Sequence, residues 1–327
     1  MNLKRNSLIV LIVVIVGIIC IFGPKKQEML GLEQNGAFAS LSKYTWNRYN
    51  ILVFRKSGNV FGMRILDITA NELKIIGTMK CKDGIYAAAA FQDGINLYSN
   101  TGELISQYKI QDTGGKIISC CISDIDGDSY EELFIIKGNG NAFYGNRLVM
   151  LFFDKGLEES YEREFMELNP WKVQTCDVDG DNRKEIALGV YKEAAFHPVM
   201  AKRPFLYHWE KDDIAPMWRG SRLSRPFEDY IFFDIDYDGR DEIIAIEMLS
   251  DGRALVNAYG WAGFGFESIA ESAVYEEILQ IIKQNGDKES LLIQVKKDRQ
   301  YSWAELKISD DKLIENAEYK KIIQIKK

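Results

Sequence analysis

Three nine-residue segments carry acidic side chains at the same four positions. Asp or Glu occupies positions 1, 3, 5 and 9 of residues 124–132, 177–185 and 234–242. These carboxylates belong to Asp124, Asp126, Asp128, Glu132, Asp177, Asp179, Asp181, Glu185, Asp234, Asp236, Asp238 and Glu242. Alternate residues of a tight loop can turn their oxygens toward one centre, where the charges repel one another unless a cation lies between them. Ca²⁺ accepts a flexible cage of about six to eight oxygens, so the pattern predicts up to three calcium ions.

An EF-hand does not account for these segments. That loop needs a Glu at position 12 and a following helix, whereas position 12 here is Ile135, Leu188 or Ala245. Each segment is followed by a short apolar, β-branched run, which predicts a strand. The pattern therefore indicates a strand–loop–strand unit that is closed by the Glu at position 9. The alternative is a metal-free turn, because Asp and Gly are ordinary turn residues.

Spaced units of this kind resemble the FG-GAP and VCBS repeat families and the calcium-binding blades of integrin α-subunit propellers. The resemblance covers about residues 117–247. It implies a β-propeller in which the backbone carbonyl of position 7 is a further metal ligand, here from Tyr130, Arg183 and Arg240. Glu at position 9 departs from the Asp that is common in integrins, but it still supplies a carboxylate.

The repeat spacing supports the same architecture. Successive units begin at Asp124, Asp177 and Asp234, 53 and 57 residues apart, and Lys283 begins a related segment 49 residues later. That last segment has no acid at positions 1 and 9. Periods of about 40–50 residues in an all-β chain are typical of propeller blades. Residues 49–327 are therefore predicted to form a β-propeller of about six to seven blades.

The N-terminal residues 1–23 are predicted to anchor the chain in a membrane. Lys4 and Arg5 precede Leu8–Phe22, an uncharged apolar run of 15 residues, which favours an uncleaved signal-anchor helix. Residues 24–48 are mixed and polar and predict a linker. The remainder is expected on the extracytoplasmic side, where Ca²⁺ is about millimolar and loops of modest affinity are filled.

Composition sets broad limits on the class of protein. The chain has 327 residues, a formal net charge of −7 and 46% hydrophobic residues. Three Ca²⁺ would bring this charge to about −1, so the acidity is explained by metal sites. The charge gives no indication of nucleic-acid binding. A disulfide among the four cysteines after residue 23 stays open; they are Cys81, Cys120, Cys121 and Cys176.

No set of residues predicts a catalytic centre. The only histidines, His197 and His208, have no Ser or Cys neighbour that resembles a nucleophile pair. No phosphate-binding Gly loop and no HExxH motif is present. The sequence therefore predicts no catalytic residue and favours a protein that is not an enzyme.

One basic segment is a candidate ligand site. Residues 192–226 hold seven Lys and Arg against four Asp and Glu, a net charge of +3. Trp218 lies beside arginines whose guanidinium groups suit carboxylate, phosphate or sulfate groups. The predicted ligand-binding residues, expected on loops, are Lys202, Arg203, Trp218, Arg219 and Arg222. The alternative is a connector between blades whose arginines pair with neighbouring acids.

Two functions remain after this reading. The favoured one is a membrane-tethered, calcium-binding propeller that acts as a binding or scaffolding module for a protein or an anionic surface polymer. The alternative is an extracellular polysaccharide lyase or hydrolase that uses the basic segment. Fold alone does not decide between them, because propellers host many activities.

Overall fold

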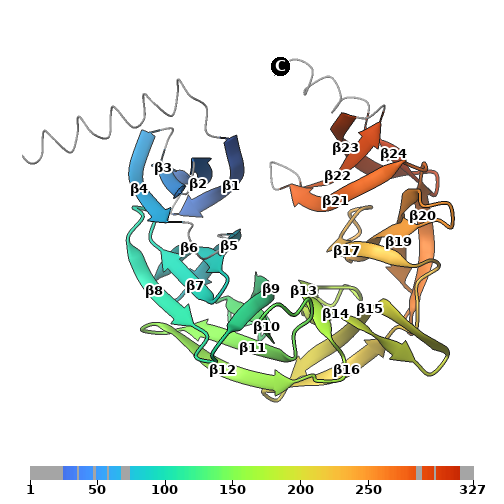
Figure 1. Ribbon diagram of the computed structural model, residues 1–327, viewed down its shortest axis with the longest axis horizontal. Helices are drawn as coiled ribbons and strands as arrows, with labels where there is room; N and C mark the ends of the chain where they lie inside the picture. The colour runs from blue at the N-terminus through green and yellow to red at the C-terminus, as the bar shows by residue number, and fades with distance from the viewer. Residues whose placement is uncertain are drawn as a thin grey trace, which may run out of the picture. The chain divides into compact units, whose positions relative to one another are not determined.

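The described part of the chain is built from β-strands alone. The computed structural model describes residues 25–34, 37–46, 49–56, 59–67, 74–284, 289–297 and 300–316. All regular secondary structure in these residues is β-strand (Figure 1). The predicted all-β class is thus confirmed. The chain divides into two compact units, one of residues up to 78 with 83–109, the other of 79–82 with 110–327.

The first eight strands form two four-stranded sheets, ordered β1-β2-β3-β4 and β5-β6-β7-β8. Their bounds are β1 (Lys25–Gln34), β2 (Ala37–Trp46), β3 (Tyr49–Lys56), β4 (Asn59–Asp67), β5 (Lys74–Cys81), β6 (Gly84–Phe91), β7 (Gly94–Tyr98) and β8 (Leu104–Lys109). Residues 24–48, predicted as a linker, thus contain the antiparallel pair β1 and β2. The intervening Asn35-Gly36 is a favoured sequence for a two-residue hairpin turn, and this signal outweighs the polar composition.

The second unit continues the same pattern with four further groups of four strands (Figure 1). The strands are β9 (Gly115–Ser123), β10 (Glu132–Asn139), β11 (Arg147–Phe153), β12 (Leu157–Glu164), β13 (Pro170–Cys176), β14 (Glu185–Ala194), β15 (His197–Glu210), β16 (Asp213–Arg219), β17 (Phe227–Phe233), β18 (Glu242–Met248), β19 (Ala254–Trp261), β20 (Phe266–Ser272), β21 (Glu277–Gln284), β22 (Ser290–Lys297), β23 (Gln300–Ser309) and β24 (Lys312–Glu315). Within each group, neighbouring strands are antiparallel. The last two groups join into one eight-stranded sheet through a short parallel pairing of β20 with β24.

The strand predicted after each acidic loop is confirmed. β10, β14 and β18 begin at the Glu of position 9, and at least the first six residues of each are buried. Their sequences are continuous apolar runs, as expected for strands covered on both faces. Each acidic loop therefore joins the first strand of a sheet to a second strand that is fixed in the core.

Neighbouring sheets of the second unit share hydrophobic cores. One cluster combines Phe134 and Leu148 of the β9–β12 sheet with Leu188 and Phe205 of the β13–β16 sheet. Equivalent clusters join β13–β16 to β17–β20, and β17–β20 to β21–β24. Burial at about 25 cal/mol per Å² of apolar area makes these shared faces the main stabilising contacts between sheets.

The metal-free repeat predicted near the C-terminus is partly described. β21 and β22 pair antiparallel, with Ile278 opposite Val295 and Lys283 opposite Leu291. The two strands predicted there are confirmed, while residues 285–288 of the connection lie outside the described part.

The predicted membrane anchor, residues 1–23, also lies outside the described residues. Within the part that is described, no helix is long and apolar enough to cross a membrane. No disulfide joins the four described cysteines, of which Cys81 and Cys176 are buried.

Candidate metal sites

The first Asp of each acidic loop organises the backbone around it. In residues 124–132, the N–H groups of Gly127 and Ser129 donate to the two oxygens of Asp124 at 2.8 and 2.9 Å. The second loop repeats these bonds onto Asp177 at the same two distances. In the third loop, Asp234 accepts from positions 5 and 6 at 3.1 and 3.0 Å. The loops therefore share one fold, set by contacts within six residues.

Two positions of each loop adopt a left-handed backbone. Positions 4 and 6 have φ between 62° and 91° in all three loops. The first two loops place Gly127 and Gly180 at position 4, whereas the third places Tyr237 there and Gly239 at position 6. A side chain other than Gly, Asn or Asp is unfavourable at such φ values. Tyr237 departs from this preference; its ring is largely exposed, and its hydroxyl donates to the carbonyl of Glu289.

A buried Glu closes each loop. Oε2 of Glu132, Glu185 and Glu242 accepts the backbone N–H of position 2 at 3.0–3.1 Å. These side chains are almost fully buried. Burial, reinforced by the neighbouring Asp charges, raises the pKa of Glu132 and Glu185 to about 7 and that of Glu242 to about 8. The loops thus hold carboxylates whose negative charge lacks compensation.

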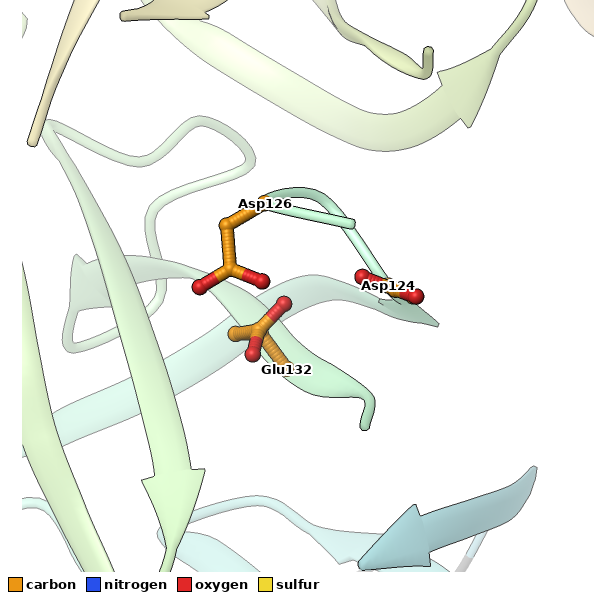
Figure 2. A group of neighbouring side chains, drawn as sticks. All are labelled: Asp124, Asp126 and Glu132. Atoms are coloured by element: carbon orange, nitrogen blue, oxygen red, sulfur yellow. The ribbon is translucent and has the colours of Figure 1, made fainter. Parts of the chain in front are cut away.

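Three acidic side chains of each loop lie close together. Figure 2 shows Asp124, Asp126 and Glu132 grouped at the loop between β9 and β10. Carboxylate oxygens within 4.8 Å of one another come from that trio, from Asp177, Asp179 and Asp181, and from Asp234, Asp236 and Glu242. The predicted ligands Asp128, Glu185 and Asp238 lie in the same loops but outside these tight groups.

The carboxylate oxygens that accept no hydrogen bond suit a hard cation. The position-7 N–H groups of Tyr130, Arg183 and Arg240 donate to Oδ1 of the Asp at position 5 at 2.7–2.9 Å. Within the described residues, the second oxygens of Asp126, Asp128, Asp179 and Asp181 accept no hydrogen bond. Several carboxylate oxygens in a flexible loop match the ligand preference of Ca²⁺.

The third loop already contains a cation of its own. The guanidinium of Arg240 bonds Oδ2 of Asp238, with Nε at 2.9 Å. This contact lowers the pKa of Asp238. Arg183, at the same position of the second loop, forms no ion pair within the described residues.

A bridge between sheets connects the second and third loops. The N–H of Asp241 donates to the carbonyl of Asp177 at 2.7 Å, and the N–H of Asp177 donates to Oδ2 of Asp241 at 2.9 Å. Glu131, at the equivalent position 8 of the first loop, exchanges the same two kinds of bond with Lys80. No role was predicted for position 8, although Glu131 and Asp241 place an acid there in two of the three loops.

The structure does not gather the predicted basic site on loops. Lys202 and Arg203 lie in β15, Trp218 and Arg219 lie in β16, and only Arg222 lies outside a strand. Residues 192–204 belong to an extension of the β14–β15 hairpin, in which Lys192 lies opposite Ala201 and Ala194 lies opposite His197.

Two members of that group have structural contacts. Arg203 is fully buried and donates to the carbonyls of Lys192, His197 and Val199 at 2.7–3.0 Å. Lys202 pairs with Glu228 at 3.1 Å. The Arg203 bonds hold the extended hairpin together, whereas the Lys202 pair links β15 to β17 of the next sheet.

Trp218 and the exposed arginines of the predicted basic site have other surroundings than Lys202 and Arg203. Trp218 packs edge-on against Trp261 and Phe266, with ring centroids 6.4 and 5.0 Å apart. Arg219 and Arg222 are exposed. Arg225, from the same segment, pairs with the buried Glu247 and with Glu271 at 2.8 and 2.7 Å. Among the predicted ligand residues, only Arg219 and Arg222 are both exposed basic residues and without an ion pair in the described part of the chain.

The histidines lie near charged neighbours. His197 Nδ1 is 3.2 Å from the Arg203 guanidinium. His208 Nδ1 is 3.7 Å from Oε1 of Glu185 in the second acidic loop. Neither contact pairs a histidine with a nucleophile.

Comparison with known proteins adds a fold relationship. No family model matches the sequence, and no curated protein matches it. A similar solved structure is a Bacteroides uniformis protein described as a candidate 6-phosphogluconolactonase. Its TM-score is 0.54 at 11% identity, and the match covers 88% of this chain and 83% of that one. At this identity the likeness concerns the fold alone.

Proposed function

We propose that this protein is a calcium-stabilised β-propeller that serves as a binding or scaffolding module. The six successive four-stranded groups support the propeller arrangement, because each has the strand content of one blade. The shared cores of the second unit also support it, since each sheet there packs on the next in sequence order.

The observation that carries the calcium proposal is the buried Glu at position 9 of each loop. A nearly buried carboxylate beside two or three further carboxylates is unfavourable unless a cation neutralises the group. The raised pKa values of Glu132, Glu185 and Glu242 express that cost. A dication would restore the ionised form, and binding only to the folded state would stabilise it by mass action.

The module is proposed to lie on the extracytoplasmic side of a membrane, tethered by residues 1–23. The apolar run Leu8–Phe22 and the availability of Ca²⁺ outside the cell support this location. Protease added to intact cells should then digest the strand-rich part, with the apolar segment retained. Recovery of a soluble form that lacks residues 1–23 would contradict the tether.

The lyase or hydrolase is the alternative, and it needs a base and a charge neutraliser in one cleft. Arg203 and Arg225 are already engaged with carbonyl and carboxylate groups. The exposed Arg219 and Arg222 are therefore the arginines of the segment that would contact either a ligand or a substrate. The lactonase assignment of the structural neighbour belongs to that protein, and its fold does not carry an activity to this chain.

The test is thermal unfolding of the purified full chain in about 2 mM Ca²⁺, an extracellular level, and in chelator. We expect the melting temperature to be several degrees higher with Ca²⁺ and elemental analysis to find up to three ions per chain. Mg²⁺ at the same concentration is the control, since its octahedral preference fits a flexible loop less well. Equal melting temperatures with no bound metal would overturn the calcium proposal.

A further inference from the structure

A groove in the second unit lies between the first two acidic loops and the β15–β16 turn. Its volume is about 540 Å³, within the range of about 300–1,000 Å³ usual for small-ligand sites. One wall is formed by the start of the first loop, Asp124–Gly127, and another by Asn182–Lys184 of the second loop. Trp209 and Glu210 at the end of β15, with the turn residues Lys211 and Asp212, complete the lining.

Trp209 presents a fixed aromatic surface in this groove. Its ring is half-buried and meets Tyr161 edge-on, with centroids 5.1 Å apart. Tyr161 is itself held by a 2.6 Å hydrogen bond to Asp213. A ring that is positioned in this way can stack on a ligand without losing further conformational entropy.

Hydrogen-bonding groups of both kinds surround that ring. Glu210 and Asp212 offer acceptors on the turn, while Arg183 and Lys211 offer donors. Neither Arg183 nor Lys211 forms an ion pair within the described residues. The two-residue turn fixes Lys211 and Asp212, both in the left-handed region, at the end of the β15–β16 pair.

We propose that this groove binds a saccharide. Sugar hydroxyls donate to carboxylates and accept from cations, so a lining of mixed sign suits them, and the C–H face of a sugar ring can pack on Trp209. The mixed charges disfavour a polyanion, which the acids would repel. A peptide strand would need an unpaired sheet edge, whereas loops and a turn form this groove. The inference rests on the proposed function, since it names a ligand class for the proposed binding module.

The test measures binding of three probes to the full chain in Ca²⁺: cellohexaose, chitohexaose and polygalacturonate. We expect at least one neutral oligosaccharide to bind and to change the tryptophan fluorescence. Arg183→Ala combined with Lys211→Ala should weaken binding at least tenfold at unchanged melting temperature, because both side chains are exposed. Trp209→Ala should abolish binding and Trp209→Phe should retain it.

Matched variants make the result decisive. Lys155→Ala with Lys307→Ala removes two exposed cations outside the groove and should leave affinity unchanged. If Trp209→Ala impairs folding, the Arg183, Lys211 variant still decides. Binding of none of the probes, of polygalacturonate alone, or binding lost only in Arg219→Ala, Arg222→Ala would overturn the inference. The calcium-dependent melting shift tests the proposed function separately, since it needs no saccharide.

Discussion

The second and third acidic loops share spacing, backbone fold and a buried closing Glu, but they differ in internal charge compensation. In residues 234–242, Arg240 neutralises part of the carboxylate cluster by bonding Asp238. In residues 177–185, Asp181 has no such ion pair with Arg183 or with any other cation of the described residues. The same residue type at the same position thus acts differently. The comparison teaches that ligand spacing defines a possible site, whereas neighbouring charges determine how strongly it depends on a metal.

The largest effect is expected from removing one charge in the second loop. Asp179→Asn keeps an oxygen that can accept the N–H of Asp181 but removes a metal-binding charge. In Ca²⁺, a loss of about 2 kcal/mol would lower the melting temperature by roughly 4–8 °C. In chelator the variant should melt slightly higher than wild type, because repulsion is relieved.

The equivalent Asp236→Asn in the third loop should show a smaller change in both conditions, since Arg240 already supplies positive charge. Scanning calorimetry of both variants, with and without Ca²⁺, checks the difference. Equal decreases in chelator and in Ca²⁺ would assign these carboxylates to turn formation alone.

A pH series tests the buried closing Glu that the second and third loops share. The pKa values of Glu185 and Glu242 are raised from an ordinary 4.5 to about 7 and 8. The unfolded chain therefore ionises first, and the metal-free protein should lose stability as pH rises from about 4.5 to 8. Ca²⁺ requires the ionised form, so the stabilisation by Ca²⁺ should grow over the same interval. Melting curves at pH 5, 6, 7 and 8 in chelator and in Ca²⁺ measure this, and a shift independent of pH would contradict it.

The smallest effect is expected for Arg240→Gln. Without Ca²⁺, loss of this internal cation should lower the melting temperature by about 1–3 °C, whereas Ca²⁺ should restore it. Arg253→Gln is the matched control, because Arg253 pairs with Asp251 two residues earlier in a turn outside the metal loops. That solvent-exposed pair contributes little to stability, so the effect of its loss should be insensitive to Ca²⁺. An equal response of the two variants would remove the proposed difference between the loops.

Local features of the acidic loops were predictable from sequence because their bonds are local. The first Asp contacts residues three to five positions ahead, and the closing Glu contacts a residue seven positions back. Apolar runs after each loop likewise predicted buried strands. The spacing of the ligands and the all-β class follow from such short-range patterns.

The contacts of two arginines could not be predicted in the same way. Arg240 lies against the second loop, where a Cβ added to Gly180 would be 2.9 Å from its Cγ. Arg203 is buried although most arginines are exposed, because the extended hairpin turns three carbonyls toward its guanidinium. Both outcomes depend on segments brought together by folding, and no spacing rule includes them.

Lys283 begins the repeat that has no acid at positions 1 and 9. It places a positive charge where the other three repeats of the chain have an Asp. Its ammonium is 3.9 Å from Asp241 and 5.7 Å from the centroid of the Phe233 ring. A cation carried by the chain cannot be removed by chelation, and its local concentration does not vary with the medium. Opening of the molecule in chelator should therefore begin at the loops that rely on a diffusible ion, and amide hydrogen exchange near β21 should be the last to accelerate.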